Sequence, residues 1–381
     1  MSKIRVGIIC GGRSGEHEVS LMSARSVMSA LDKNRYEIVA IGITKEGRWL
    51  TGADPLGTLE SMAEMGQGSG EGAGQSRDTK AGGFVTSLAE HRASRELLPG
   101  LAANGIPYVD VLFPVLHGPY GEDGTVQGLL ELADIPYVGA GVLGSALAMD
   151  KVAMKAVFCA EGFPVADYVP VMRWEWDQAP AQVSARAEQR VGYPCFVKPA
   201  NLGSSVGVTK VHTAAELPAA MDVAARYDRK LLVEKAVNAR EIECSVLGND
   251  HPVASLPGEV IPRREFYDYE AKYFDQDTEL IVPADLTAGK VAEIQQLAVR
   301  AFVALDCAGM ARADFFMDRV ADQIYINELN TIPGFTAVSM YPRMWAASGL
   351  PYPELLDRLI QLAFERHRDK GRMSTAFKSN D

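Results

Sequence analysis

The N-terminal part of the chain alternates between short apolar runs and amphipathic stretches. Residues 4–10 are mostly apolar and β-branched and are stopped by Gly11 and Gly12, which predicts a buried strand. Residues 20–31 carry apolar side chains at helical spacing, and residues 36–43 form a second strand-like run. This strand–helix–strand order predicts a parallel sheet covered by helices, so we expect an α/β fold at the start of the chain.

The apolar pattern disappears between residues 52 and 83, where glycine, serine, glutamate and glutamine dominate. Such a stretch buries too little apolar surface to offset its chain entropy, so we predict a disordered surface insertion. The pattern returns as a strand over residues 109–116, a helix over 126–133 and a strand over 135–138.

The second half of the chain is expected to contain both helices and strands. Helices are predicted over residues 146–161, 288–305 and 353–366, and strands over residues 165–171, 194–198, 231–234 and 241–247. Residues 309–317 and 323–327 flank a turn and predict a hairpin. The basic residues 366–372 are expected to be a solvated helix C-terminus, which the helix dipole favours.

Composition narrows the classes of protein that the chain can be. Its 381 residues include 49 acidic and 38 basic side chains, a net charge of −11, which argues against broad binding of nucleic acid or of an anionic membrane. No apolar run approaches the roughly 18 residues of a membrane span. The apolar stretch of residues 6–10 is too short for the core of a secretory leader, so we do not expect export. Five scattered cysteines, none in a C-x-x-C pair, favour a reducing cytoplasm.

The predicted hairpin carries the most informative chemistry. Because alternate side chains of a strand face the same way, Glu328 and Asn330 project together, and Arg312 and Asp314 share a face on the other arm. Carboxylate and amide oxygens suit Mg²⁺, and Arg312 adds a fixed positive charge beside them. The alternative is a hairpin whose polar residues simply face water.

A glycine- and serine-rich loop, residues 201–207, follows Lys198. Backbone N–H groups of such a loop can close over phosphate oxygens, with the lysine as a cation at its base. The loop lacks the G-x-x-x-x-G-K-S/T pattern, which excludes P-loop NTPases. An ordinary glycine-containing hairpin is the alternative.

Two other signals are weaker. Residues 139–144 match G-x-G-x-x-G between a strand and a helix, but no acidic residue ends the following strand, so dinucleotide binding is disfavoured. No G-x-S-x-G elbow is present. Taken alone, His117 would be interpreted as an ordinary loop histidine, and Lys151 as an ordinary surface lysine.

Eight short motifs occur in a fixed order along nearly the whole chain. They are residues 11–20, 117–124, 149–151, 198–199, 203–207, 270–273, 312–314 and 327–336. Together they resemble the ATP-grasp superfamily and, within it, the D-alanine–D-alanine ligase family. The insertion and the basic tail are the parts that fit poorly.

The resemblance implies an ATP-grasp fold, α+β in its C-terminal part, preceded by the parallel α/β sheet. It implies an N-terminal domain over residues 1–138, a central domain with the phosphate-binding loop over 139–234, and a C-terminal domain with the metal site over 235–381. Residues 264–277 would form a lid that excludes water. A homodimer is expected by family analogy.

The resemblance also implies a reaction. ATP phosphorylates the carboxylate of one D-alanine, the amine of a second D-alanine attacks the acyl phosphate, and the dipeptide serves bacterial cell-wall precursors. Two Mg²⁺ ions, for which Mn²⁺ can substitute, would be held by Asp314, Glu328 and Asn330, with Glu328 as the bridge.

The remaining roles implied by the family pattern concern ATP and D-alanine. Residues assigned to ATP are Lys151, Lys198, Ser205, Glu234, Lys235, Ala236, Val237, Glu241, Phe316 and Asn327. Residues assigned to catalysis are Glu16, Ser204, Tyr273, Arg312 and Gly334. His117, Lys272 and Ser339 are assigned to the amino-acid substrates.

Within these sets, Glu234 would read the adenine amino group and Glu241 the ribose, and Glu16, Ser204 and Tyr273 would hydrogen-bond together. Relatives that make an ester with D-lactate lack the lid pattern of residues 270–273, so its presence favours an amine as the nucleophile. Two alternatives stay open: another ATP-grasp ligase, including the ester-forming variant, and a nucleotide-binding regulatory protein without turnover. The four hairpin residues, Arg312, Asp314, Glu328 and Asn330, speak against the regulatory protein.

Overall fold

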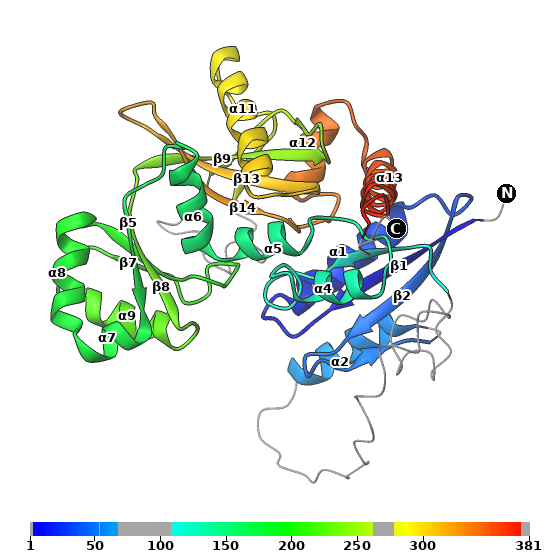
Figure 1. Cartoon of the computed structure of the whole chain (residues 1–381), viewed down its shortest axis with the longest axis horizontal. Helices are drawn as coiled ribbons and strands as arrows, with labels where there is room; N and C mark the ends of the chain where they lie inside the picture. Colours follow the sequence, from blue (N-terminus) through cyan, green and yellow to red (C-terminus); the bar gives the residue numbers. More distant parts are fainter. Residues whose placement is uncertain (1–2, 53, 68–107, 262–277, 375–381) are drawn as a thin grey trace, which may run out of the picture.

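The chain folds around three separate sheets, each with its own helices (Figure 1). The computed structural model describes residues 3–52, 54–67, 108–261 and 278–374. The predicted lid of residues 264–277 therefore lies outside the described residues. No helix in the described ranges is long and apolar enough to cross a bilayer.

The first sheet confirms the predicted parallel α/β opening. Its strand order is β3 (Trp49–Leu50), β2 (Tyr36–Ile43), β1 (Ile4–Gly11) and β4 (Val111–Val115), with β2, β1 and β4 parallel. Alternate residues of β1 enter different cores. Val6 and Ile8 pack toward α1 (His17–Ala30) and the C-terminal helix α13 (Tyr352–Lys370), whereas Ile9 packs toward α4 (Thr125–Leu132).

The second sheet is antiparallel, in the order β5 (Tyr168–Met172), β8 (Lys230–Lys235), β6 (Cys195–Pro199) and β7 (Thr209–Val211). Its apolar face packs on α7 (Arg173–Gln178), α8 (Pro180–Arg190) and α9 (Leu217–Ala225), drawn in green in Figure 1. The opposite face carries Lys198 and the buried Glu234.

The third sheet contains the predicted hairpin. Its order is β12 (Glu279–Ile281), β11 (Gly258–Ile261), β9 (Ala239–Gly248), β13 (Gly309–Asp318) and β14 (Ile324–Asn330), with β10 (Val253–Ala254) paired to β9. One face packs against α5 (Val142–Met149), α6 (Lys151–Ala160) and α11 (Ala288–Ala304). The other face meets α12 (Met340–Ala347), whose Tyr341 hydroxyl donates to the carbonyl of Val246.

Two predictions for the first half of the chain are wrong in part. Residues 55–67, expected within a disordered insertion, form the helix α2 (Pro55–Gln67), because Leu56 and Leu59 bury their side chains in the first core. Residues 68–83 lie outside the described structure. Residues 135–138 form no strand in the described part of the chain, and Tyr137 makes a single bridge to Leu112.

The helix predicted over residues 146–161 is two helices. The carboxylate of Asp150 accepts hydrogen bonds from the backbone N–H groups of Val152 (3.1 Å) and Ala153 (3.0 Å), which caps α6 and ends α5 at Met149. Lys151 therefore starts a new helix, and its backbone N–H donates to the carbonyl of Ala200, which follows β6 of the second sheet.

The basic end of α13 is not simply solvated, because Arg366 is partly buried. Its guanidinium donates to the carbonyl groups of Gly139 and Tyr137 and lies 4.1 Å from the centroid of the Tyr137 ring. The expectation for residue 366 was wrong, since the helix end docks on the segment that follows α4.

Candidate active site

The hairpin presents its polar side chains on one face, as the alternation of residues predicted. Along β13, Ala311, Ala313 and Phe315 are buried in the core, whereas Arg312 and Asp314 point to the other side. Asp314 lies opposite Glu328, and Arg312 lies opposite Asn330. The four candidate residues therefore gather on one surface.

Arg312 is the electrostatic centre of this surface. Its Nε and a terminal nitrogen each donate to one oxygen of Asp314 at 2.7 Å, and Nε lies 3.2 Å from Glu243 on β9. Burial works against the charged guanidinium, but Asp314 and Glu243 outweigh it and raise the pKa of Arg312. The side chain is thus a fixed cation at neutral pH.

The acidic residues here form a row across three strands. Glu243 and Glu328 both lie opposite Asp314, on either side of it. Neighbouring carboxylates repel one another unless a cation lies among them, and hard oxygen donors suit Mg²⁺. In the described part of the chain no three acidic, histidine or cysteine side chains converge on one point. The residues fit a divalent cation if Asn330 or phosphate oxygens complete its ligands.

A cationic cluster lies beside this row. Lys151 Nζ is 3.5 Å from Glu328 and donates to the carbonyl of Leu202 at 2.8 Å. Lys198 Nζ donates to Glu234 at 2.7 Å. Burial lowers the pKa of Lys198, but the carboxylate of Glu234 outweighs burial, so the pKa is raised. Burial alone would raise the pKa of Glu234, but the ammonium groups of Lys155 and Lys198 lower it to about 2.

The glycine- and serine-rich loop connects this cluster to the N-terminal sheet. Ser204 and Ser205 have φ angles of 49° and 59°, and the Ser204 hydroxyl donates to Glu16. A Cβ atom at Gly203 would lie 2.8 Å from a Glu16 oxygen, so a side chain there would displace the Glu16 carboxylate. The predicted contact between Glu16 and Ser204 is present, while Tyr273 lies outside the described residues.

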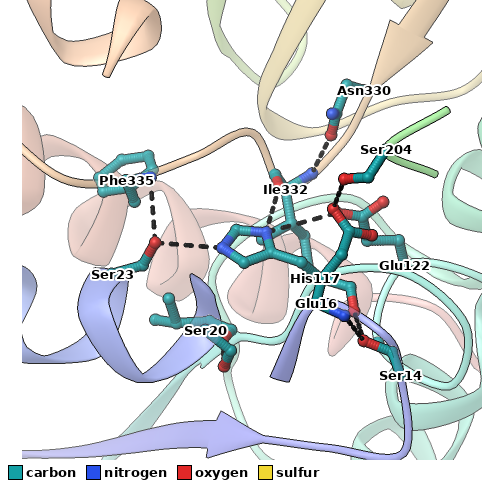
Figure 2. Close-up of polar contacts among 12 residues, drawn as sticks. Ser14, Glu16, Ser20, Ser23, His117, Glu122, Ser204, Asn330, Ile332 and Phe335 are labelled. Carbon is teal, nitrogen blue, oxygen red and sulfur yellow. Dashed lines mark hydrogen bonds and ion pairs between the residues drawn. The ribbon is translucent and has the colours of Figure 1, made fainter. Parts of the chain in front are cut away.

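Beside Glu16, His117 is the centre of a buried polar network (Figure 2). Its Nδ1 lies 2.9 Å from the carbonyl of Ile332 and 3.6 Å from a carboxylate oxygen of Glu122, and its Nε2 lies 3.1 Å from the Ser23 hydroxyl. Ser23 also accepts from the backbone N–H of Phe335. Both ring nitrogens thus contact protein groups, and the network holds the segment around Gly334 against α1.

The pKa of Glu122, in this network, shifts in the direction opposite to that of Glu234. Burial raises the pKa of Glu122 to about 7, with His117 opposing the shift and Glu16 adding to it. Burial lowers the affinity of His117 for a proton, but Glu122 and Glu16 outweigh it, so the pKa of His117 is raised. Both pKa values are thus raised, that of Glu122 chiefly by burial and that of His117 by its carboxylate neighbours.

Comparison with known proteins identifies the relatives of this chain. The family model described as "D-ala D-ala ligase N-terminus" matches residues 5–140, and "D-ala D-ala ligase C-terminus" matches residues 157–361. The chain belongs to the D-alanine–D-alanine ligase family. A relative from Heliobacterium modesticaldum named D-alanine–D-alanine ligase is 50% identical over 98% of both chains.

Two solved structures of similar proteins are also informative. The D-alanine–D-alanine ligase from Coxiella burnetii is 38% identical, with a TM-score of 0.78 over 98% of this chain and 97% of that one. The VanG D-Ala:D-Ser ligase from Enterococcus faecalis is 35% identical, with a TM-score of 0.78 over 95% of this chain and all of that one. The ATP-grasp fold and the use of ATP follow from family membership.

The other residues that the D-alanine–D-alanine ligase pattern indicated lie at the edges of this site. The backbone N–H groups of Lys235 and Ala236 donate to the carbonyls of Asp167 and Pro194, so these two N–H groups are already engaged within the protein. Val237 follows them in the connection from β8 to β9. Phe316 lies opposite Glu241 in the register of β13 and β9.

The residues proposed for the two substrates are only partly described. The Ser339 hydroxyl accepts from the backbone N–H of Thr336 at 3.1 Å and lies 3.2 Å from the position a Cβ of Gly334 would take. The Asn330 side-chain oxygen accepts from the N–H of Ile332. Lys272 and Tyr273 lie outside the described residues.

Sequence reasoning missed four residues that the structure brings into the site: Ser23, Glu122, Lys155 and Glu243. Three of them had a positional signal. Lys155 lies one helical turn after Lys151, and Glu243 shares a strand face with Glu241. Glu122 lies in the same glycine-rich motif as His117. Ser23 had no signal, because only tertiary packing brings α1 beside residues 332–335.

Proposed function

We propose that this protein joins two D-alanine molecules into D-alanyl-D-alanine, with ATP as the energy source, for the synthesis of peptidoglycan precursors. One observation carries the proposal: a single loop links a cationic cluster to the acidic side chain of Glu16. Lys151 holds the carbonyl of Leu202, and Ser204 two residues later binds Glu16. Positive charge suited to phosphates and negative charge suited to an ammonium group therefore lie on two sides of one loop.

In the first step, a carboxylate oxygen of the first D-alanine attacks the γ-phosphorus of ATP, and ADP leaves. Glu16 binds the ammonium group of this substrate. Lys151 and Lys198 bind the phosphates, and Ser205 adds a donor from the loop. Phosphoryl transfer depends mainly on positioning and charge neutralisation, which these side chains provide.

In the second step, the amine of the second D-alanine attacks the acyl carbon, the C–O bond to phosphate breaks, and the proton lost by the nitrogen leaves with the inorganic phosphate. Arg312 and the backbone N–H of Gly334 stabilise the tetrahedral oxyanion. Ser339 binds the carboxylate of the second substrate, with Lys272 nearby. Since both nitrogens of His117 contact protein groups, we assign it to positioning the segment around Gly334 and the first carboxylate.

Two Mg²⁺ ions, or Mn²⁺ in their place, would be held by Asp314, Glu328 and Asn330, with Glu328 shared between them. When bound, they would neutralise the charge of the transferred phosphoryl group. In this structure Arg312 is paired with Asp314. When Asp314 binds a cation, Glu243 would remain as a partner for the guanidinium of Arg312.

The base and ribose of ATP would lie beside Phe316, Glu241, Asn327 and residues 235–237. Glu234 was assigned to the adenine amino group, but both of its oxygens lie within 2.7 Å of a lysine nitrogen. An adenine amino group that contacted Glu234 would therefore have to share one of these oxygens with a lysine. The proposal also includes the lid with Tyr273, the division into three domains, a homodimer and a cytoplasmic location. The five cysteines are free, which fits a reducing compartment.

A second candidate function is a ligase with a different second substrate. The similarity to a solved D-Ala:D-Ser ligase is the observation that favours it. The two candidates share the first D-alanine and differ only in the nucleophile.

A coupled assay of ADP release distinguishes these functions. We expect turnover to require Mg²⁺ and D-alanine, with D-alanyl-D-alanine as the product identified by mass spectrometry. D-Serine or D-lactate added to limiting D-alanine should yield little mixed product. A mixed product in excess would move the assignment to the second candidate, and no turnover with any amino acid would reject both.

A further inference from the structure

A lysine outside the predicted site lies at the junction of the second and third sheets. Lys155 is on α6, four residues after Lys151, so the two side chains share a face of that helix. Its side chain is only 1% exposed. Lysine is rarely buried to this extent without charged partners, because removing an ammonium group from water is costly.

The partners of Lys155 come from both sheets. Its Nζ lies 2.5 Å from Oε1 of Glu234, on β8 of the second sheet. It also donates to the backbone carbonyl of Asn327, on β14 of the third sheet, at 3.1 Å. One ammonium group thus joins the two surfaces between which the phosphates of ATP are proposed to bind.

The carbonyl of Asn327 is available to Lys155 because of a β-bulge. In the register of β13 and β14, Asp314 lies opposite Glu328 and Phe315 lies opposite Ile326, so Asn327 is the extra residue. A bulge turns the backbone of its extra residue out of the ladder. The irregularity adjoins the proposed metal ligand Glu328, which connects Lys155 to the position of that side chain.

Glu234 is shared between two lysines. Its other oxygen, Oε2, accepts from Lys198 at 2.7 Å, and the side chain of Glu234 is 1% exposed. Two ammonium groups and one carboxylate leave one net positive charge in the cluster. Without Lys155, Lys198 would be the sole cation near Glu234, and its charge would be neutralised by that carboxylate.

We propose that Lys155 is a positioning residue of the nucleotide site, which engages one oxygen of Glu234 and so leaves Lys198 with charge to offer the phosphates. It acts through Glu234 and Asn327, since its buried ammonium group does not reach the solvent-facing surface where ATP binds. This inference rests on the proposed use of ATP, and it adds a residue to the phosphate side of the site.

The test is the affinity for AMP-PNP with MgCl₂, measured by calorimetry in the absence of D-alanine. Lys155→Met keeps the length of the side chain and removes its charge. We expect its dissociation constant to rise about tenfold, the loss typical of one charge-assisted interaction. Lys290→Met is the control, since Lys290, on α11, pairs instead with Glu293 and Asp322; the affinity of this variant should change by less than about twofold.

Two further variants separate positioning from general stability. Lys155→Arg keeps the charge and should bind AMP-PNP within about threefold of the wild-type protein. In Lys155→Met/Glu234→Gln, Lys198 no longer faces an unshared carboxylate, so part of the lost affinity should return. This double variant also keeps the test available if Lys155→Met alone does not fold.

Some outcomes would overturn the proposal. A folded Lys155→Met with wild-type affinity and a lower melting temperature would mean that Lys155 only stabilises the fold. Equal losses in the Met and Arg variants, or no recovery in the double variant, would equally reject the role of its charge. Because AMP-PNP binding needs no turnover, these results are independent of whether the wild-type protein releases ADP with D-alanine.

Discussion

Glu234, which is buried, and Glu122, whose side chain is 12% exposed, lie on opposite sides of the loop of residues 201–207, and their pKa values shift in opposite directions. Burial pushes the pKa of both upward. Glu234 has two lysines beside it, and its pKa falls to about 2. Glu122 has a single histidine and the further carboxylate of Glu16, and its pKa rises to about 7.

The difference shows that burial raises the pKa of each carboxylate, and that the number of neighbouring cations decides whether this effect is overcome. The side proposed for ATP holds surplus positive charge, because Lys155 and Lys198 share one carboxylate. The side proposed for D-alanine holds surplus negative charge, because Glu16 and Glu122 share one histidine. Each side thus carries the charge opposite to that of its proposed ligand.

The largest effect is expected where the two sides meet, on the hairpin. Asp314→Asn removes a carboxylate from the centre of the acidic row, and we expect kcat to fall about 1000-fold, since charge neutralisation at the phosphoryl group is lost. Asp318→Asn at the turn of the same hairpin is the control, because its side chain accepts from the backbone N–H groups of Val320 and Ala321 and lies outside the acidic row. Comparable rates for the two variants would remove Asp314 from the site.

The next effect tests whether the two sides are separable. Glu16→Gln should raise KM for D-alanine about thirtyfold and leave the affinity for AMP-PNP unchanged. Lys198→Met should weaken the affinity for AMP-PNP and leave KM for D-alanine unchanged, because the charge of Lys198 is proposed to bind the phosphates. Calorimetry for the nucleotide and initial rates for D-alanine measure both, and crossed effects of equal size would contradict the division of charge.

A smaller effect concerns the pH dependence of stability. The folded-state pKa of Glu122 is raised above its ordinary 4.5 to about 7, so its contribution to stability is fully present below pH 4.5 and is lost as pH rises through 7. Between pH 5.5 and 8.5 the wild-type protein should lose about 2 kcal/mol relative to Glu122→Gln. Urea unfolding at the two pH values measures this difference, and parallel pH profiles would mean that Glu122 titrates normally.

The smallest effect tests the histidine network itself. Ser23→Ala removes the hydroxyl that joins His117 to the backbone of Phe335. We expect a loss of about 1 kcal/mol in unfolding free energy and a modest fall in kcat with little change in nucleotide affinity. Ser29→Ala on the same helix is the control, since its hydroxyl bonds only the preceding turn at Arg25. A change in AMP-PNP affinity would show that the network reaches the nucleotide side.

Local pattern was enough to predict the parallel opening and the polar face of the hairpin. Alternation along a strand depends only on backbone geometry, so Arg312 and Asp314 could be placed on one face from sequence. Local pattern failed to predict α2, because Leu56 and Leu59 pack in the first core, and the surrounding glycine-rich composition does not indicate this burial. It also failed at Asp150, whose capping hydrogen bonds split one apparent helix into two.

The sequence by itself determined the element types, the family and most of the residues that bear charge in the site, since these follow from periodicity and short motifs. Only the tertiary structure decided how those charges are shared. Glu234, Lys155 and Lys198 lie on three different elements, and the side-chain pairs that shift a pKa depend on distances of a few ångströms across them. Burial and partner choice arise from packing, and packing is not encoded in any one segment.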